Sequence, residues 1–272
     1  MEKYSILISI YHKEHADCFE QSLESIFKQI CLPDEVILVE DGPLTEELYA
    51  VIARYVNLYP IIKTVRLPQN VGLGRALNEG LKYCSCDLVA RMDTDDIAKP
   101  DRFQKQLEIF SKIPDVDICS SWVEEFIDNT DNVCSVKKVP EKHWEILRYA
   151  QSRCPVNHPA VMFRKSAVQA VGGYQHFPLL EDYYLWIRLL INGAKFYNIQ
   201  ESLLYFRTSS DTFDRRGGWS YLKNEIKFWR LAYQCHFVSF FRLLQNILIR
   251  IPARLCPNRL RRFLYAKLLR RR

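Results

Sequence analysis

The 272-residue chain lacks the sequence features that mark several large classes of protein. No apolar run reaches the ~18 residues that a transmembrane helix needs, and we find no signal-peptide pattern. Internal repeats, low-complexity tracts and the paired CxxC motifs of zinc sites are also missing. These absences argue against a membrane-spanning bundle, a repeat array and a zinc ribbon. An apolar fraction of 48% excludes a disordered chain.

The cysteines show no disulfide framework. There are nine of them, an odd number, and the one close pair is Cys84 and Cys86. We therefore expect reduced, mostly buried thiols in a cytoplasmic protein. The length allows one large domain with a substantial core.

Short apolar runs alternate with helical patterns through the first ~110 residues. Four such alternations indicate an open, mainly parallel α/β sheet, in which ligands bind beyond the carboxyl ends of the strands. The predicted strands span residues 5–10, 35–40, 61–67 and 88–92, and the predicted helices span residues 16–30, 44–58 and 73–83. Further along, we expect a strand over 160–163 and a helix over 183–191.

Three carboxylates follow the fourth predicted strand within four positions, at Asp93, Asp95 and Asp96. Acids held this close repel each other, so the arrangement favours a cation or basic partners nearby. Mg²⁺ and Mn²⁺ prefer such oxygen ligands and commonly join them to substrate phosphates. The alternative is a solvated acidic turn before a helix that Pro100 opens. Asp96 can instead cap that helix or pair with Arg102.

Five ordered segments resemble one enzyme family. They read SILISIYHKE, VILVEDGP, NVGLGRALNEGL, ARMDTDDIAKPDRF and LLEDYYLWIRL. In order and spacing they are similar to inverting family-two glycosyltransferases of the GT-A fold, especially bacterial enzymes that build surface polysaccharides. The match covers residues 5–210 and implies a single Rossmann-like mixed, mainly parallel sheet flanked by helices.

The resemblance also implies a division of the chain. Residues 1–215 would form the glycosyltransferase domain, with residues 1–112 as its nucleotide-sugar-binding half and residues 113–215 as its acceptor half. Residues 216–272 would form a helical C-terminal region, basic and amphipathic from about residue 236.

The resemblance assigns the donor site to the ends of the first, second and fourth strands. Tyr11 would stack on the base of a UDP-sugar, and Asp41 would hydrogen-bond its uracil ring. Asp93 would lie near the ribose and the metal, and Asp95 would ligate the Mn²⁺ or Mg²⁺ ion that bridges the two phosphates. Without the resemblance, Asp41 reads as an ordinary turn residue before Gly42.

The glycine-rich segment 70–75 is not a dinucleotide fingerprint, because Gly72 and Gly74 lack the third glycine of that motif. The glycines favour close backbone approach instead. In the resembling family this segment begins a helix that lines the donor site, so Arg75 could reach a phosphate. The alternative is a surface arginine on an ordinary helix.

The acceptor half would supply the catalytic general base. An acceptor hydroxyl that attacks the anomeric carbon needs a carboxylate to take its proton, and by resemblance Asp182 is that base, with Glu181 beside it. Taken alone, this acidic pair is a favourable dipole interaction in the first turn of a helix. His158 either lines the acceptor cleft or is a packed, hydrogen-bonded histidine.

The resemblance implies a nucleotide-sugar donor, a glycan or lipid-linked oligosaccharide as acceptor, and inversion by direct displacement. Two rival functions remain. A sugar-nucleotide pyrophosphorylase would carry a glycine- and lysine-bearing loop, but residues 11–14 contain no glycine. A non-catalytic nucleotide-sugar-binding protein would be expected to lack an acid at Asp93, Asp95 or Asp182, and all three are present.

Charge is unevenly distributed along the chain. From Arg242 onward there are ten basic and no acidic residues, whereas the preceding 241 residues carry 28 basic and 32 acidic ones. Apolar residues recur at helical spacing at Phe237, Phe240, Phe241, Leu244, Ile247, Leu248 and Ile251. This pattern predicts an interfacial helix on an anionic membrane surface.

The alternatives for this tail are a helix packed on the catalytic domain and a nucleic-acid-binding arm. We favour the membrane and expect no nucleic-acid partner. The predicted location is therefore the cytoplasmic face of the membrane, with the protein bound peripherally, and the oligomeric state stays open.

Overall fold

The computed structural model describes residues 2–208 and 218–255. The strands are β1 (Tyr4–Ile10), β2 (Glu35–Glu40), β3 (Ile62–Arg66), β4 (Leu88–Met92), β5 (Ile97–Ala98), β6 (Ile118–Phe126), β7 (Val133–Lys137), β8 (Met162–Arg164) and β9 (Phe196–Arg207). The helices are α1 (Ala16–Phe27), α2 (Glu46–Leu58), α3 (Leu73–Tyr83), α4 (Arg102–Lys112), α5 (His143–Ala150), α6 (Lys165–Ala170), α7 (Glu181–Ile191), α9 (Gly218–Gln234) and α10 (Phe240–Leu255), with a 3-10 turn η1 (His158–Ala160).

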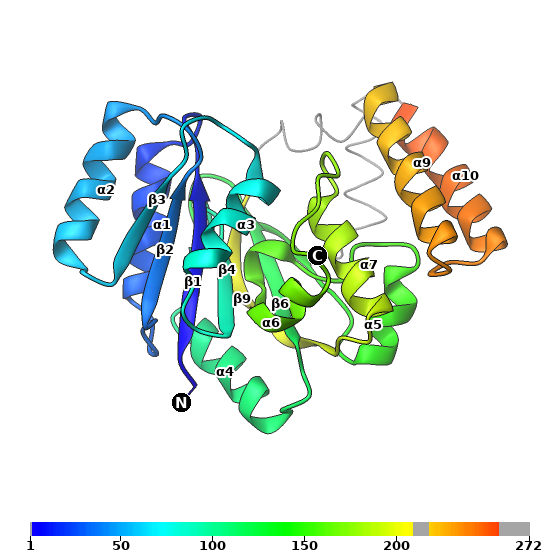
Figure 1. Cartoon of the computed structure of the whole chain (residues 1–272), viewed down its shortest axis with the longest axis horizontal. Coiled ribbons are helices and arrows are strands. Elements are labelled where there is room, and N and C mark those ends of the chain that lie inside the picture. Colours follow the sequence, from blue (N-terminus) through cyan, green and yellow to red (C-terminus); the bar gives the residue numbers. More distant parts are fainter. Residues whose placement is uncertain (1, 209–217, 256–272) are drawn as a thin grey trace.

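The strands form one mixed sheet in the order β3-β2-β1-β4-β8-β6-β9-β5, and β7 pairs with β6. Figure 1 shows β1 to β4 of this sheet side by side. Strands β1 to β4 run parallel to one another. The second half of the sheet mixes antiparallel pairs, such as β4 with β8, with the parallel pair β6 and β9. The predicted α/β alternation is therefore confirmed, and it places the ends of β1, β2 and β4 at one edge of the sheet.

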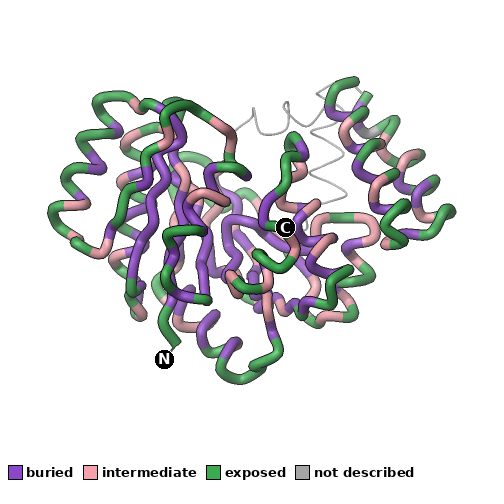
Figure 2. Tube along the Cα trace, viewed as in Figure 1, coloured by how far each residue is buried: buried purple, intermediate pink, exposed green. Residues whose placement is uncertain are grey.

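Helices cover both faces of the sheet. One apolar cluster joins one face to α1, α2 and α4, through residues such as Phe19, Leu48 and Phe103. A second cluster joins the other face to α3, α5, α6 and α7, through residues such as Leu77 and Trp186. The central strands are accordingly buried along most of their length (Figure 2). Burial on both faces explains why these strands read as continuous apolar runs.

Helix α3 lies against the sheet at a glycine. A Cβ atom on Gly80 would come within 2.4 Å of Leu7 Cδ1 and 2.6 Å of Val39 Cγ2, so no larger side chain fits without a shift. The helix begins after Gly72, whose φ of +88° favours glycine. This packing fixes the start of α3 beside the end of β2.

Several element boundaries differ from the prediction. The first helix ends at Phe27, and Ile30 beyond it is exposed, so the periodic pattern overran the helix. Helix α4 begins at Arg102 after an N-cap at Asp101, and Pro100 does not open it. The predicted strand 160–163 is a 3-10 turn followed by β8 from Met162.

Helices α9 and α10 form a hairpin at one end of the molecule, next to α7 (Figure 1). A third apolar cluster attaches the hairpin to α7, with Tyr183 and Ile187 meeting Phe228, Trp229 and Leu243. Helix α10 continues through Pro252 to Leu255. No helix within residues 2–208 or 218–255 combines the length and apolarity that crossing a membrane requires.

The cysteines only partly follow the expectation. The eight in the described ranges are free thiols, but Cys84, Cys86 and Cys119 are the only ones of these that are buried. The prediction of mostly buried thiols was therefore wrong, because several cysteines lie on partly exposed helix and loop surfaces.

Candidate active site

A cavity of about 540 Å³ lies at the carboxyl ends of β1, β2 and β4 and reaches the start of α7. Five of the six predicted site residues line it, namely Tyr11, Asp41, Asp93, Asp95 and Asp182. The sheet topology explains this gathering, since parallel neighbours end at the same edge. The sixth, Arg75, is exposed on α3 and does not line this cavity.

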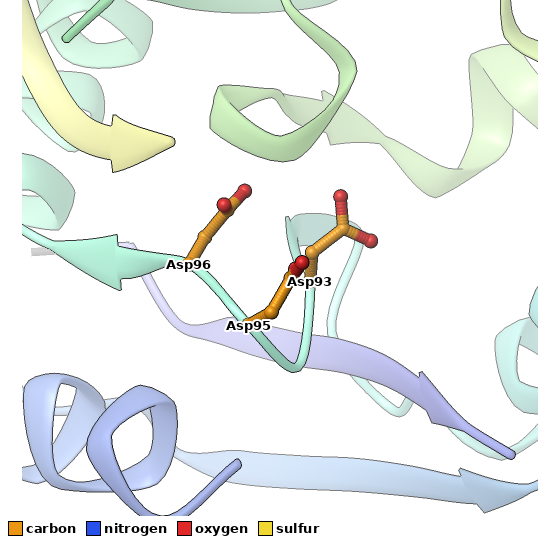
Figure 3. Close-up of side chains that lie close together, drawn as sticks. All are labelled: Asp93, Asp95 and Asp96. Carbon is orange, nitrogen blue, oxygen red and sulfur yellow. The ribbon is translucent and has the colours of Figure 1, made fainter. Parts of the chain in front are cut away.

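The three acids after β4 lie close together (Figure 3). One carboxylate oxygen from each of Asp93, Asp95 and Asp96 lies within 4.8 Å of the others. Burial, with the neighbouring Asp93 and Glu14 carboxylates, raises the pKa of Asp95 to about 7. Burial and the charges of Asp95 and Asp93 raise the pKa of Asp96 well above its usual range. A positive ion near the cluster would relieve this repulsion.

Asp96 neither caps the next helix nor forms an ion pair with Arg102 among the described residues, so both predictions for it were wrong. Its Oδ1 accepts a hydrogen bond from the backbone N–H of Arg207 at 2.9 Å. Its Oδ2 is buried and has no hydrogen-bond partner within the described part of the chain. Hard oxygen donors with one such orphaned atom fit Mg²⁺ or Mn²⁺. The residues present therefore suit the predicted metal, with Asp96 as an added member of the cluster.

Arg91 is a cavity residue that the sequence analysis missed. Its side chain is 2% exposed, and its guanidinium pairs with both carboxylate oxygens of Asp93. Such a bidentate pair fixes the carboxylate in one orientation. A basic residue inside the otherwise apolar strand β4 was the signal that could have identified it.

Asp41 organises the loop that leads into α3. Its carboxylate accepts hydrogen bonds from the backbone N–H groups of Val71 at 2.7 Å and Gly72 at 3.1 Å, and from Asn70 Nδ2 at 3.0 Å. The next residue, Gly42, has a φ of +87°, and a Cβ there would meet the Asn70 backbone N at 2.6 Å. Asp41 therefore holds the loop before α3 in place, and its contact with uracil stays a prediction.

The start of α7 supplies the other wall of the cavity. Asp182 lies in the first turn, where the partial positive charge of a helix N-terminus favours a carboxylate. Cys154 Sγ lies 3.8 Å from Asp182 Oδ2, and burial raises the pKa of that thiol, which keeps it a donor. Burial also raises the pKa of Glu181. A Cβ on Gly74 would lie 3.4 Å from Glu181 Cγ, an ordinary van der Waals contact, and a Cβ on Gly72 would meet nothing within 4 Å, so the predicted close backbone approach at these two glycines is not found.

His158 is both packed and at the cavity wall. Its Nε2 lies 2.8 Å from the hydroxyl of Tyr174, and its ring meets Trp186 edge-on at 5.9 Å between centroids. Burial, and secondarily Arg91, lowers the pKa of His158 well below its usual range. The ring is therefore neutral at pH 7. Tyr174, which the sequence analysis did not single out, also lines the cavity.

Comparison with known proteins identifies the family. Residues 5–170 match the family described as Glycosyl transferase family 2, and residues 88–269 match Glycosyl transferase family group 2. The chain is 44% identical to an Escherichia coli protein named UDP-Gal:alpha-D-GlcNAc-diphosphoundecaprenol beta-1,3-galactosyltransferase, over 99% of this chain and 97% of that protein. It is 40% identical to the amylovoran biosynthesis glycosyltransferase AmsE of Erwinia amylovora, over 97% and 98% of the two chains.

Solved structures share the fold at low sequence identity. S. aureus TarS 1-349 in complex with UDP-GlcNAc superposes with a TM-score of 0.64 at 16% identity, over 93% of this chain and 72% of that one. A mannosyltransferase from Pyrobaculum calidifontis, in complex with GDP-Man and Mn2+, gives a TM-score of 0.65 at 14% identity, over 92% and 69% of the two chains. The chain spans 43% of the longer TarS structure.

The predicted GT-A fold and the predicted family are thereby confirmed. The family match covers more than half of the chain, and the matched range includes the acid cluster and the loop around Asp41. The chain belongs to glycosyl transferase family 2 and is a glycosyltransferase.

Proposed function

We propose that the protein transfers a hexose from a UDP-sugar to a hydroxyl of a sugar that is linked through diphosphate to a lipid, with inversion of the anomeric centre. The observation that carries the proposal is one cavity lined both by Asp93 and Asp95 of the acid cluster after β4 and by Asp182. Galactose is the first donor sugar to test, because the E. coli relative is named for UDP-Gal. The product would extend a bacterial surface polysaccharide.

The donor half of the cavity carries the predicted UDP contacts. The Tyr11 ring offers a face on which uracil can stack, and Asp41 retains acceptor capacity beyond its three hydrogen bonds, because a carboxylate has about four lone-pair sites. Asp93 and Asp95, with Asp96 behind them, would hold Mn²⁺ or Mg²⁺. When bound, such an ion offsets the negative charge that develops on the leaving diphosphate. Arg91 keeps the Asp93 carboxylate in place.

The acceptor half would supply the proton transfer. In the proposal, Asp182 takes the proton from the attacking hydroxyl as the new glycosidic bond forms and the bond to UDP breaks. Cys154 Sγ lies on the Oδ2 side of Asp182, and Oδ1 is the oxygen proposed to face the acceptor. No second carboxylate is assigned as a covalent nucleophile, and a single displacement inverts the anomeric carbon.

The other functions are less well supported. A sugar-nucleotide pyrophosphorylase is disfavoured by the family match, and a non-catalytic binding protein is disfavoured by the complete set of acids in one cavity. The division at residue 215 stays a proposal. It agrees with a sheet that ends at Arg207 and a separate hairpin from Gly218.

The location is part of the same proposal. A lipid-linked acceptor is presented at a membrane surface, so we place the enzyme at the cytoplasmic face, where the free thiols agree with a reducing compartment.

A donor screen tests the proposed substrate class. The full chain is incubated with Mn²⁺, a lipid-diphosphate-linked N-acetylglucosamine acceptor, and UDP-, GDP- and dTDP-sugars in parallel, and release of the nucleoside diphosphate is measured. We expect acceptor-dependent release of UDP, with UDP-galactose the most active donor. Release from GDP-sugars alone would contradict the uracil contact of Asp41. Release of pyrophosphate from UTP and a sugar phosphate would favour a pyrophosphorylase.

A further inference from the structure

Helix α10 departs from the pattern of an ordinary surface helix. A helix on a globular protein normally turns its apolar stripe inward and its charges outward. In α10 the side facing the protein carries Asn246, Arg250 and Arg254 beside the apolar Leu243 and Ile247, while other large apolar side chains of the same helix face solvent. Both the buried polar side chains on the inner side and the exposed apolar side chains on the outer side need a physical reason.

The inner side is held by a polar network. Glu225 of α9 is 4% exposed and accepts hydrogen bonds from Arg254 Nε at 2.7 Å and Nη2 at 2.8 Å. Arg250 Nε lies 3.3 Å from the same carboxylate, and its Nη2 donates to the carbonyl of Ser152 at 2.6 Å. Asn246 donates to the carbonyl of Gln151 at 2.8 Å. These directional contacts fix the rotation of α10 about its own axis.

The outer side is an apolar stripe. It repeats at spacings of three and four residues, which places its members along one line of the helix. Phe241 is 82% exposed and Leu248 is 64% exposed. The stripe consists of Phe241, Leu244, Leu248, Ile251 and Leu255, with Phe240 beside it. Of the apolar residues predicted for this face, Phe237 and Ile247 instead pack partly into the third apolar cluster.

Charge around the stripe indicates which surface it contacts. From Gly218 to Arg272 the sequence contains one acidic residue, Glu225, and Arg250 and Arg254 pair with it in the interior. The outward-facing charges of α9 are basic, at Lys223, Lys227 and Arg230. The 17 residues that follow Leu255 contribute seven basic side chains and no acidic one. An apolar stripe on a hairpin whose exposed α9 charges are basic is complementary to an anionic lipid bilayer.

We propose that the α9–α10 hairpin docks the enzyme on an anionic membrane, with the Phe241–Leu255 stripe inserted among the lipids and Glu225 fixing α10 in the rotation that presents it. This refines the sequence prediction, which counted ten basic residues from Arg242 onward in a membrane-facing tail. Arg250 and Arg254 serve the inner network instead. The basic attraction then comes from the α9 surface and from residues 256–272, which lie outside the described structure.

Vesicle binding by matched single variants tests the proposal. Leu248→Ser and Phe241→Ser remove stripe residues, and Ile249→Ser removes an apolar side chain of similar exposure, 59%, that lies off the stripe. With vesicles of phosphatidylglycerol and phosphatidylcholine, the full chain should co-sediment, and each stripe variant should bind about tenfold more weakly, as expected when a large apolar side chain stays in water. Ile249→Ser should bind like the parent.

Two further measurements keep the outcomes distinct. Part of the binding should survive 1 M salt, because apolar insertion is not screened, and stripe variants should lose that part. The thermal unfolding midpoints of the parent and the variants should match, since these side chains face solvent.

Equal binding by parent and stripe variants would overturn the proposal. So would a dimer in sedimentation velocity that Leu248→Ser dissociates, since the stripe would then be a contact between copies. UDP release with a water-soluble acceptor is scored separately, so a failure here leaves the proposed reaction untouched.

Discussion

Replacement of Asp182 by asparagine is expected to lower the rate of sugar transfer by ~10²–10⁴-fold, the usual contribution of general acid–base catalysis. An amide has nearly the same shape as the carboxylate but cannot take the proton of the acceptor hydroxyl. The first turn of α7 and the contact with Cys154 place the side chain in the cavity. UDP affinity, measured by calorimetry with Mn²⁺ present, should change little.

Glu181→Gln provides the matched control. Glu181 is the adjacent acid in the same helical turn and lines the same cavity. In the proposal it does not take the proton, so its amide variant should retain most of the transfer rate. If Glu181→Gln is the more damaging change, the base has been assigned to the wrong acid. If Asp182→Asn loses UDP binding in proportion to rate, Asp182 belongs to the donor site.

Asp95→Asn is expected to reduce transfer by more than ~10²-fold, because several kcal/mol of charge stabilisation on the leaving diphosphate would be lost with the metal. The fold should remain intact. Removing one of three mutually repelling carboxylates relieves repulsion when no metal is present, so the thermal unfolding midpoint in EDTA should not fall.

Asp101→Asn separates this effect from a general change of charge. Asp101 occupies the N-cap position of α4 without a side-chain capping hydrogen bond, and it lies outside the cavity. It pairs with Lys105 at 2.7 Å, a partly exposed contact that contributes little to stability. Its variant should transfer sugar at close to the parental rate. EDTA should abolish activity of the parent, and Mn²⁺ should restore it. Transfer that persists in both Asp95→Asn and EDTA would rule out the metal site.

The sheet could be predicted because strands that are buried on both faces appear in the sequence as short apolar runs. The runs at Ser5–Ile10 and Leu88–Met92 are mostly apolar, and the strand ends then place Tyr11, Asp41 and Asp93 at one edge. Element ends were harder to predict, since Ile30 continues the helical pattern of α1 but lies past its end, where its N–H bonds to the carbonyl of Pro100. Such a contact between distant segments leaves no local pattern.

The roles that the sequence analysis missed depend on tertiary contacts in the same way. The role of Asp96 follows from the backbone N–H of Arg207, more than 100 residues away in sequence. Tyr174 enters the cavity because Asn78 holds its backbone, donating to its carbonyl at 2.6 Å and accepting from its N–H at 2.8 Å. Likewise, the inward direction of Arg250 depends on Glu225 in the neighbouring helix. Sequence spacing shows which residues share a face but not what that face meets.

The anomeric configuration of the product tests the central claim most directly. UDP-galactose, in which the sugar is α-linked, is reacted with the lipid-diphosphate-linked acceptor, and the product is examined by proton NMR at the new anomeric position. Direct displacement assisted by Asp182 predicts a β-linked galactose and stoichiometric UDP. An α-linked product would contradict the account, because retention requires a second displacement and a nucleophile that the proposed site does not include.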